Sequence, residues 1–128
     1  MVSVEMAKVK RIERGWAGHF ICASRCRFRR NTLLICGDTE IVVSTVGLME
    51  DGKGGFSEIG HNRYYETMAF YADKSDRRYH DADIGRQIYF DSPWEIDEID
   101  ADDRANEMHE AVVTEILDKM EMGLVSVA

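Results

Sequence analysis

The sequence predicts an α+β fold, in which an antiparallel sheet of about five strands carries one amphipathic helix near the C-terminus. Apolar residues recur at helical spacing over about 103–122, which indicates a helix with one buried face. Residues 41–49 are rich in β-branched side chains and are typical of a strand. The chain of 128 residues has the length of a single domain, with the sheet at about 2–91 and an acidic connection at 95–102.

Strands are expected wherever apolar and polar residues alternate between turn-forming residues. We expect them, in chain order, over residues 2–6, 19–31, 32–36, 41–49, 63–71 and 84–90, with loops at 50–62 and 73–83. Gly37, Asp38 and Thr39 form the predicted turn of a hairpin between the third and fourth of these strands.

The C-terminal helix has predicted signals at both ends. Asp102 or Asp103 can cap its N-terminus, where acidic residues also suit the helix dipole. Gly123 is a suitable residue just after its last turn. The apolar tail 124–127 is expected to pair with a sheet edge, in the same chain or in a partner. Because one helix cannot cover both faces of such a sheet, we also expect a homo-oligomer.

The net charge of −8 hides a gradient along the chain. Residues 1–37 carry a charge of +6, residues 38–90 carry −4 and residues 91–128 carry −10. The overall acidity argues against a basic nucleic-acid-binding domain, so direct nucleic-acid binding is not expected. It argues equally against a protein held on a membrane surface by charge.

The cellular location is predicted from three further observations. No apolar run approaches the roughly 18 residues of a membrane helix. Residues 1–14 carry charges throughout and lack the apolar core of a signal peptide. Cys22, Cys26 and Cys36 are an odd number of cysteines, which suggests reduced thiols. Together these observations predict a cytoplasmic protein that makes no membrane contact.

An arginine-rich segment at residues 25–30 is the most distinctive local feature. In an extended strand Arg25, Arg27 and Arg29 project from one face, roughly 7 Å apart, while the residues between them point toward the core. Arginine suits bidentate recognition of phosphates and carboxylates. Three partners stay open: the chain's own acidic residues, the phosphate of a small ligand, or the acidic patch of another protein.

The aromatic strand predicted after the glycine-rich loop is a second candidate surface. Alternation places Tyr65 and Tyr71 on one face, and Tyr64 and Glu66 on the other. If one face is exposed, its tyrosines can stack on a nucleotide base; otherwise the strand is an inner one, buried on both sides. Glu66 needs a partner in this apolar row, and Arg86 on the neighbouring strand is the expected one.

Two patterns match metal or phosphate sites only in part. His19, Cys22 and Cys26 have spacings that suit metal ligands, but a strand would point His19 away. Buried thiols are therefore the expectation, and no metal is predicted. The glycine-rich stretch 52–55 contains a lysine but lacks the Ser or Thr and the helix of a phosphate-binding loop, so a hairpin tip is expected.

The acidic residues before and along the helix are a candidate surface for a basic partner. Their pattern does not fit a calcium loop, and helix capping with solvation is the simpler interpretation. The residues concerned are Asp97, Asp100, Asp102, Asp103, Glu107 and Glu110.

Catalytic motifs are absent from the sequence. His80 next to Asp81 permits a guess at acid–base chemistry, but a polar loop is the simpler interpretation. A small enzyme using His80 or His61 is therefore the least favoured function, and neither catalytic residues nor cofactors are predicted.

Four stretches of the chain resemble small proteins encoded by bacteriophages and prophages. They are residues 14–22, 25–34, 63–68 and 108–113, within a similarity that spans most of residues 11–115. The resemblance implies phage origin and a place in the cytoplasm of the host. Small phage proteins without enzymatic motifs often act by binding, including as inhibitors or ligand sponges of host defence.

The leading hypothesis is a non-enzymatic protein that antagonises host defence by sequestering a small phosphate-bearing nucleotide. Its predicted ligand-binding residues are Arg25, Arg27, Arg29, Arg30, Arg63, Tyr64, Tyr65, Tyr71 and Arg86. The alternative is an acidic inhibitor, similar to anti-CRISPR proteins, that imitates nucleic acid and occupies a basic site on a host defence protein.

Overall fold

The structure is a computed structural model that describes residues 8–14, 19, 23–73, 75 and 82–126. Its elements are β1 (Lys10–Glu13), the 3-10 turn η1 (Ala23–Arg25), β2 (Cys26–Cys36), β3 (Thr39–Glu50), β4 (Phe56–Ser57), β5 (Tyr65–Ala72), β6 (Ala82–Ile88), β7 (Glu95–Ile96) and α1 (Asp102–Met122). The predicted strand at residues 2–6 lies outside the described residues. Within the described ranges, no helix is long and apolar enough to cross a membrane.

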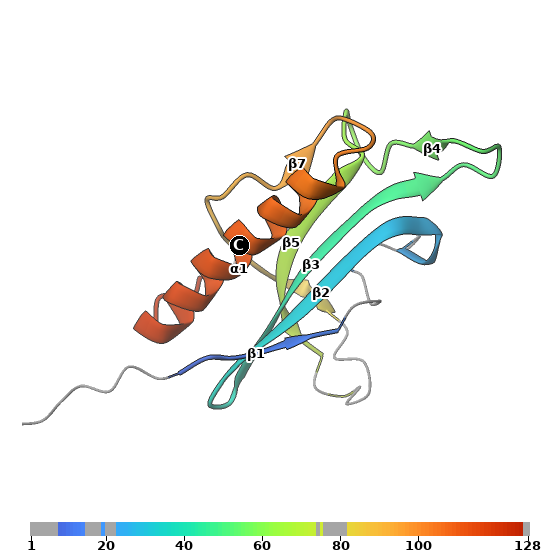
Figure 1. The fold of residues 1–128 in the computed structure, drawn as a ribbon. Helices are drawn as coiled ribbons and strands as arrows, with labels where there is room; N and C mark the ends of the chain where they lie inside the picture. Colours follow the sequence, from blue (N-terminus) through green and yellow to red (C-terminus); the bar gives the residue numbers. More distant parts are fainter. Residues whose placement is uncertain (1–7, 15–18, 20–22, 74, 76–81, 127–128) are drawn as a thin grey trace, which may run out of the picture.

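The strands form one antiparallel sheet with the order β1-β2-β3-β5-β6. The short strands β4 and β7 extend it by pairing with β3 and β5. One helix, α1, crosses one face of this sheet (Figure 1). The predicted α+β fold is therefore confirmed. Three of its strands lie outside the predicted ones: β1 at residues 10–13, β4 within the predicted loop and β7 within the acidic connection.

The β2–β3 hairpin is the longest pairing in the sheet and confirms the predicted turn. Cys36 pairs with Thr39, and Gly37 between them has a φ of 60°, a left-handed conformation that glycine adopts at little cost. The predicted strands 19–31 and 32–36 are in fact one strand, β2, which begins at Cys26. The 3-10 turn η1 precedes it, so Arg25 does not belong to the strand.

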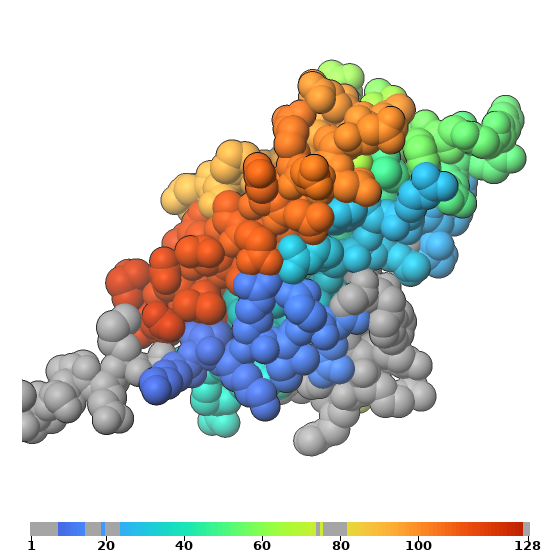
Figure 2. Space-filling model, viewed as in Figure 1, coloured from blue at the N-terminus to red at the C-terminus, as the bar shows by residue number. Residues whose placement is uncertain are grey.

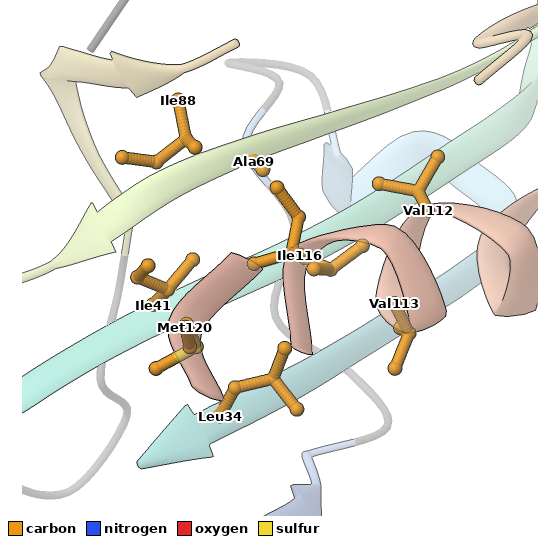
Figure 3. Close-up of a cluster of buried hydrophobic side chains, with 9 residues drawn as sticks. Leu34, Ile41, Ala69, Ile88, Val112, Val113, Ile116 and Met120 are labelled. Carbon is orange, nitrogen blue, oxygen red and sulfur yellow. The ribbon is translucent and has the colours of Figure 1, made fainter. Parts of the chain in front are cut away.

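The main core lies between α1 and the sheet. Apolar residues from β2, β3, β5 and β6 face four apolar residues of the helix, as the helical spacing predicts. Figure 3 shows the facing side chains, which are Leu34, Ile41, Ala69 and Ile88 from the strands and Val112, Val113, Ile116 and Met120 from the helix. A second cluster, built around Phe28, Leu48 and Tyr65, packs under the first turns of the helix.

The helix agrees with the prediction at its C-terminus and differs from it at its N-terminus. Gly123 has the expected left-handed conformation, and its N–H donates to the Met120 carbonyl. The predicted cap by Asp102 or Asp103 is wrong: the N-cap residue is Ala101, with no side-chain cap. Both acids lie instead in the first turn, where they still suit the helix dipole.

The C-terminal tail lies against its own chain, which was one of the two predicted alternatives. The Tyr89 N–H donates to the Ser126 carbonyl at 2.9 Å, so the tail contacts the end of β6 within the same chain.

Six of the eight residues of β5, which is the predicted aromatic strand, are buried. The interpretation of this strand as an inner one, covered on both faces, is therefore confirmed.

Candidate ligand-binding site

The arginines of residues 25–30 lie in three different environments. Arg25 precedes the strand and donates from Nη2 to the Glu50 carbonyl at 2.8 Å. The Arg27 side chain is 65% exposed, with Nε 3.9 Å from Glu50 Oε1. Arg29 is half-buried on the same strand, whereas Arg30 alternates to the face that carries the helix. The predicted row of three arginines along one strand is therefore wrong, because Arg25 lies outside β2; Arg25 and Arg27 both lie near Glu50.

Arg27 lines a pocket with the β3–β4 hairpin. The pocket has a volume of about 200 Å³. Its walls are Arg27, Glu50, Gly52, Gly54, Gly55 and Phe56. The Arg27 guanidinium lies 5.3 Å from the centre of the Phe56 ring, a cation–π distance. This hairpin extends beyond the rest of the sheet in Figure 1, so the pocket stands at an accessible end of the molecule.

The glycine-rich tip of the hairpin has a defined conformation. The Asp51 carboxylate accepts the backbone N–H groups of Lys53 at 2.7 Å and Gly55 at 3.1 Å. Gly52 and Gly54 have φ values of 78° and 86°, which strongly favour glycine. The expected hairpin tip is thus confirmed, and the two hydrogen bonds to Asp51 hold its backbone.

Arg30 belongs to a charged cluster on the helix side of the sheet. Its Nη2 donates to Glu13 at 3.0 Å and to Glu110 at 2.9 Å. Arg11 of β1 donates through both Nη atoms to Glu110, and the hydrogen bond from Arg11 and then that from Arg30 lower the pKa of Glu110 to about 2. Figure 2 shows β1 and β2, in blue and cyan, directly against the orange helix. For Arg30, the chain's own acids are the partner.

Two of the three candidate tyrosines, Tyr64 and Tyr65, pack against the core and do not form an exposed surface on which a base could stack. Tyr65 is fully buried; its hydroxyl donates to Asp102 at 2.7 Å and accepts the Ala101 N–H at 3.0 Å. Burial and then the bond to Asp102 raise the pKa of Tyr65. Tyr64 is half-buried against the same core cluster. Tyr65 is therefore a core residue that holds the start of α1.

Tyr71 and Arg86 form a separate pair on the β5–β6 side of the sheet. The Arg86 guanidinium lies 4.1 Å from the centre of the Tyr71 ring. Both residues line a polar pocket whose other walls include Asp38, Glu40 and Asp73. The acidic walls make this pocket unsuited to a phosphate, since an anion there would meet like charges.

Glu66 has partners other than the expected Arg86. Its two carboxylate oxygens contact His19 Nε2 at 3.0 Å and Arg63 Nε at 2.8 Å. Burial alone would raise the pKa of Glu66, but the hydrogen bonds and charges of His19 and Arg63 outweigh burial and lower it. The prediction that the buried Glu66 needs a partner is correct. The predicted partner, Arg86, is wrong, because Arg63, three residues earlier in the chain, binds Glu66 instead.

Ser44, His19 and Glu66 follow the order nucleophile, base and carboxylate of a hydrolase. Ser44 Oγ lies 3.0 Å from His19 Nδ1. However, Ser44 is fully buried, and its oxygen also accepts the His19 backbone N–H at 3.1 Å. A nucleophile must reach its substrate, so this chain of hydrogen bonds holds residue 19 against the sheet and does not define an active site.

The acidic segment divides into free and engaged carboxylates. Asp102 accepts the Tyr65 hydroxyl and Glu110 binds two arginines, so both carboxylates already have a partner within the chain. Glu98 pairs with Arg104 at 2.9 Å. The remaining predicted partner residues, which are all exposed, are Asp97, Asp100, Asp103 and Glu107.

The other candidate chemical groups do not assemble into a site. Within the described ranges, no three His, Cys, Asp or Glu side chains are placed to hold a metal ion. Cys26 is buried and Cys36 half-buried, and they form no disulfide. His61 hydrogen-bonds only its neighbour Asn62 in the described part of the chain. Cys22 and His80 lie outside the described residues.

Comparisons of this chain with protein-family models, with curated proteins and with solved structures found no match. The candidate site therefore rests on the geometry of the molecule itself. Phe56 is the site residue that the sequence analysis missed, although its place directly after the glycine-rich stretch is visible in the sequence.

Proposed function

We propose that this protein binds a small phosphate-bearing ligand, such as a nucleotide, in the pocket between Arg27 and the β3–β4 hairpin. The observation that carries the proposal is the convergence of a guanidinium, an aromatic ring and a glycine-rich turn on one pocket. Arginine provides bidentate hydrogen bonds to phosphate, and an aromatic ring provides a surface on which a base can stack.

Arg27 is available to an incoming anion. Its ion pair with Glu50 is long, at 3.9 Å, and both side chains are more than half exposed, at 65% and 57%. Exposed pairs of this kind contribute little to stability, so a phosphate can replace Glu50 at little cost. Arg25 and Lys53 flank the pocket and add positive charge to offset Glu50 and Asp51.

The size of the pocket limits the ligand. Its volume of about 200 Å³ is below the roughly 300–1,000 Å³ of typical small-molecule pockets. We infer that the phosphate and one ring enter it, while the rest of the nucleotide lies outside. Affinity then depends on few contacts, and Arg27 provides the strongest of them.

Calorimetry of the full chain with a panel of nucleotides and cyclic dinucleotides tests the proposal. We expect at least one to bind. Arg27→Ala should weaken it by about tenfold or more through loss of a charge-assisted hydrogen bond, and Phe56→Ala by about tenfold or more through loss of base stacking. Arg104→Ala is the matched control, because it removes an arginine that is 55% exposed and pairs with Glu98 elsewhere. Failure of every nucleotide to bind, or unchanged binding by Arg27→Ala, contradicts the proposal.

The resemblance to phage proteins supports a biological role for such binding. Sequestering a nucleotide signal inside an infected cell would antagonise a host defence system that depends on it. This part of the proposal requires that the bound ligand be a signal nucleotide, so the calorimetric panel must include cyclic dinucleotides as well as ATP and GTP.

Inhibition of a basic host protein is the second candidate function. It is favoured by the exposed carboxylates that extend from residue 97 to Glu107 across the start of α1. Charge reversal by Asp103→Lys with Glu107→Lys should then abolish salt-sensitive binding to a poly-lysine surface, while Arg27→Ala should leave it unchanged. Equal retention of the reversed variant on that surface would exclude this function.

A further inference from the structure

Another pocket lies along β5, between the stretch that pairs with β6 and the stretch that pairs with β7. β6 pairs with β5 as far as Ile88, which is opposite Ala69. The chain then leaves the sheet and returns where the Trp94 carbonyl accepts the Thr67 N–H at 2.8 Å. The gap is a pocket of about 250 Å³, lined mainly by apolar side chains. Its walls are Thr67, Met68, Gln87, Ile88, Tyr89, Phe90 and Trp94.

The loop that forms this pocket is fixed in place by Glu115 of the helix. The Glu115 carboxylate accepts the N–H groups of Asp91 at 2.7 Å and Ser92 at 2.9 Å, and the Ser92 hydroxyl at 2.6 Å. Burial would raise the pKa of Glu115, but the bond to Lys119 and those from the loop outweigh it and lower the pKa to about 2. The pocket is therefore formed before any partner arrives.

Two aromatic side chains are exposed at this pocket. Tyr89 is 52% exposed and Trp94 is 39% exposed, although both residue types are usually more buried. Tryptophan and tyrosine are the residues that most often dominate the energy of protein interfaces. Exposed apolar surface around a pocket marks a place where another molecule binds.

The size of the pocket favours a single side chain as its occupant. A volume of about 250 Å³ is below the roughly 300–1,000 Å³ of pockets that hold whole small molecules. The apolar lining selects a large aliphatic or aromatic side chain.

The charges beside the pocket favour a basic partner. Asp91 and Glu95 are exposed next to the lining residues Phe90 and Trp94. Arg63 lies 5.1 Å from the centre of the Trp94 ring and contacts Glu66 and Glu95. Lys119 lies 5.4 Å from the centre of the Tyr89 ring and contacts Glu115. These three carboxylates and Asp91 outnumber the two cations. The surroundings are thus net negative and complement lysine or arginine on either side of the inserted side chain.

We propose that this pocket docks one large apolar side chain from an extended, lysine- and arginine-rich segment of a protein partner. The aromatic rings of Tyr89 and Trp94 enclose the inserted side chain, and Asp91 and Glu95 attract its basic neighbours. The docking does not depend on the nucleotide pocket at Arg27, so the two proposals can fail independently.

A fluorescein-labelled peptide tests the chemistry of the occupant. The probe has one leucine with Lys-Arg on each side, and its binding to the full chain is followed by fluorescence anisotropy. We expect saturable binding that weakens by about tenfold or more when the leucine is replaced by serine, or when the basic residues are replaced by glutamates. Absence of binding, or equal binding of the basic and acidic peptides, overturns the proposal.

Variants of the protein test the location. Trp94→Ala should weaken binding of the basic peptide by about tenfold, whereas Trp94→Phe should retain most of it. Ile99→Ala is the matched control, because Ile99 is 42% exposed and does not line the pocket. Equal loss in Ile99→Ala would overturn the assignment. Sedimentation that shows a concentration-dependent dimer of the parent chain, lost in Trp94→Ala, would instead assign the pocket to a second copy and also overturn it.

Discussion

His109 shows how a polar side chain is accommodated in the centre of this core. It is fully buried, with Nε2 2.7 Å from Thr32 Oγ1 and Nδ1 2.7 Å from Thr45 Oγ1. The Thr32 hydroxyl donates to Glu13, so its oxygen accepts from Nε2–H, and Nδ1 accepts from the Thr45 hydroxyl. The contact between Thr45 and Thr67 extends this chain of hydrogen bonds to β5. In its neutral form the imidazole therefore carries its proton on Nε2.

The buried imidazole should make stability depend on pH. Burial, and then the charge of Arg30, lower the pKa of His109 to about 4 from its ordinary value of 6.5. In the unfolded chain His109 binds a proton near pH 6.5, so the folded state loses stability as the pH falls from about 6.5 to about 4. The two pKa values correspond to a loss of roughly 3 kcal/mol in the free energy of unfolding.

Urea unfolding at pH 7, 5 and 4 measures this loss. Nitrogen NMR of the imidazole should show the Nε2–H tautomer at pH 6 and protonation only near pH 4. A titration of His109 near pH 6.5 in the folded protein would contradict the assignment of a buried, neutral imidazole.

Gly47 is a position where a side chain cannot be tolerated. A Cβ atom there would lie 2.3 Å from Tyr65 Cδ2 and 2.9 Å from the Tyr64 carbonyl oxygen. We expect Gly47→Ala to lower the free energy of unfolding by about 2 kcal/mol or more, because the buried Tyr65 ring must move. Gly85→Ala is the control: among the described residues its Cβ meets only Asp83 Oδ1, at 3.4 Å, and the change should stay within about 0.5 kcal/mol. Equal stability of the two variants in urea would contradict this packing.

The partners of individual side chains are the part of the site that the sequence predicts least well. Alternation correctly separates Tyr65 from Glu66 across the two faces of the strand. It cannot show that the helix covers the face of Tyr65, or that His19 reaches Glu66 from a distant segment. Both depend on the tertiary arrangement, which local pattern does not contain.

Among the secondary structure elements, β1, β2 and α1 are joined by charge as well as by apolar packing. Glu110 of the helix binds Arg11 of β1 and Arg30 of β2. Its side chain is 44% exposed, so solvent screens much of the attraction. The cluster nevertheless joins three elements, and it fixes the side of α1 that faces the first two strands.

Glu110→Gln should therefore destabilise the fold moderately. We expect a loss of about 1 kcal/mol in the free energy of unfolding, since two arginines lose their shared carboxylate. Glu98→Gln is the matched control, because Glu98 pairs only with Arg104 in the described part of the chain and should cost less than about 0.5 kcal/mol. The two variants are compared by chemical denaturation at low salt; indistinguishable midpoints would show that the cluster contributes nothing.

The long elements were predictable because their patterns are strong and local. The β-branched run of β3, the Gly37 turn and the apolar spacing of α1 each determine one element. The short strands β1, β4 and β7 were missed, because two to four residues show too little periodicity to indicate a strand. They form strands because the backbone groups of β2, β3 and β5 are available to pair with β1, β4 and β7, respectively.

At the scale of the whole molecule, the charge gradient is partly neutralised within the fold. The basic first 37 residues contribute Arg11 and Arg30, which bind Glu110 from the acidic last third. Arg25 and Arg27 lie beside Glu50 instead, at the hairpin that carries the pocket. Arg25 and Arg27 therefore place positive charge at the hairpin end of the sheet.

The proposed phosphate site lies at this end of the sheet. The most direct measurement is an amide NMR titration of the full chain with the nucleotide or cyclic dinucleotide that binds best in calorimetry. We predict shifts confined to the residues that line the pocket, which are Arg27, Glu50, Gly52, Gly54, Gly55 and Phe56, and to Lys53 between them. Shifts that map to Arg86 and Tyr71 or to the Trp94 pocket, or no shifts at saturating ligand, would contradict the account.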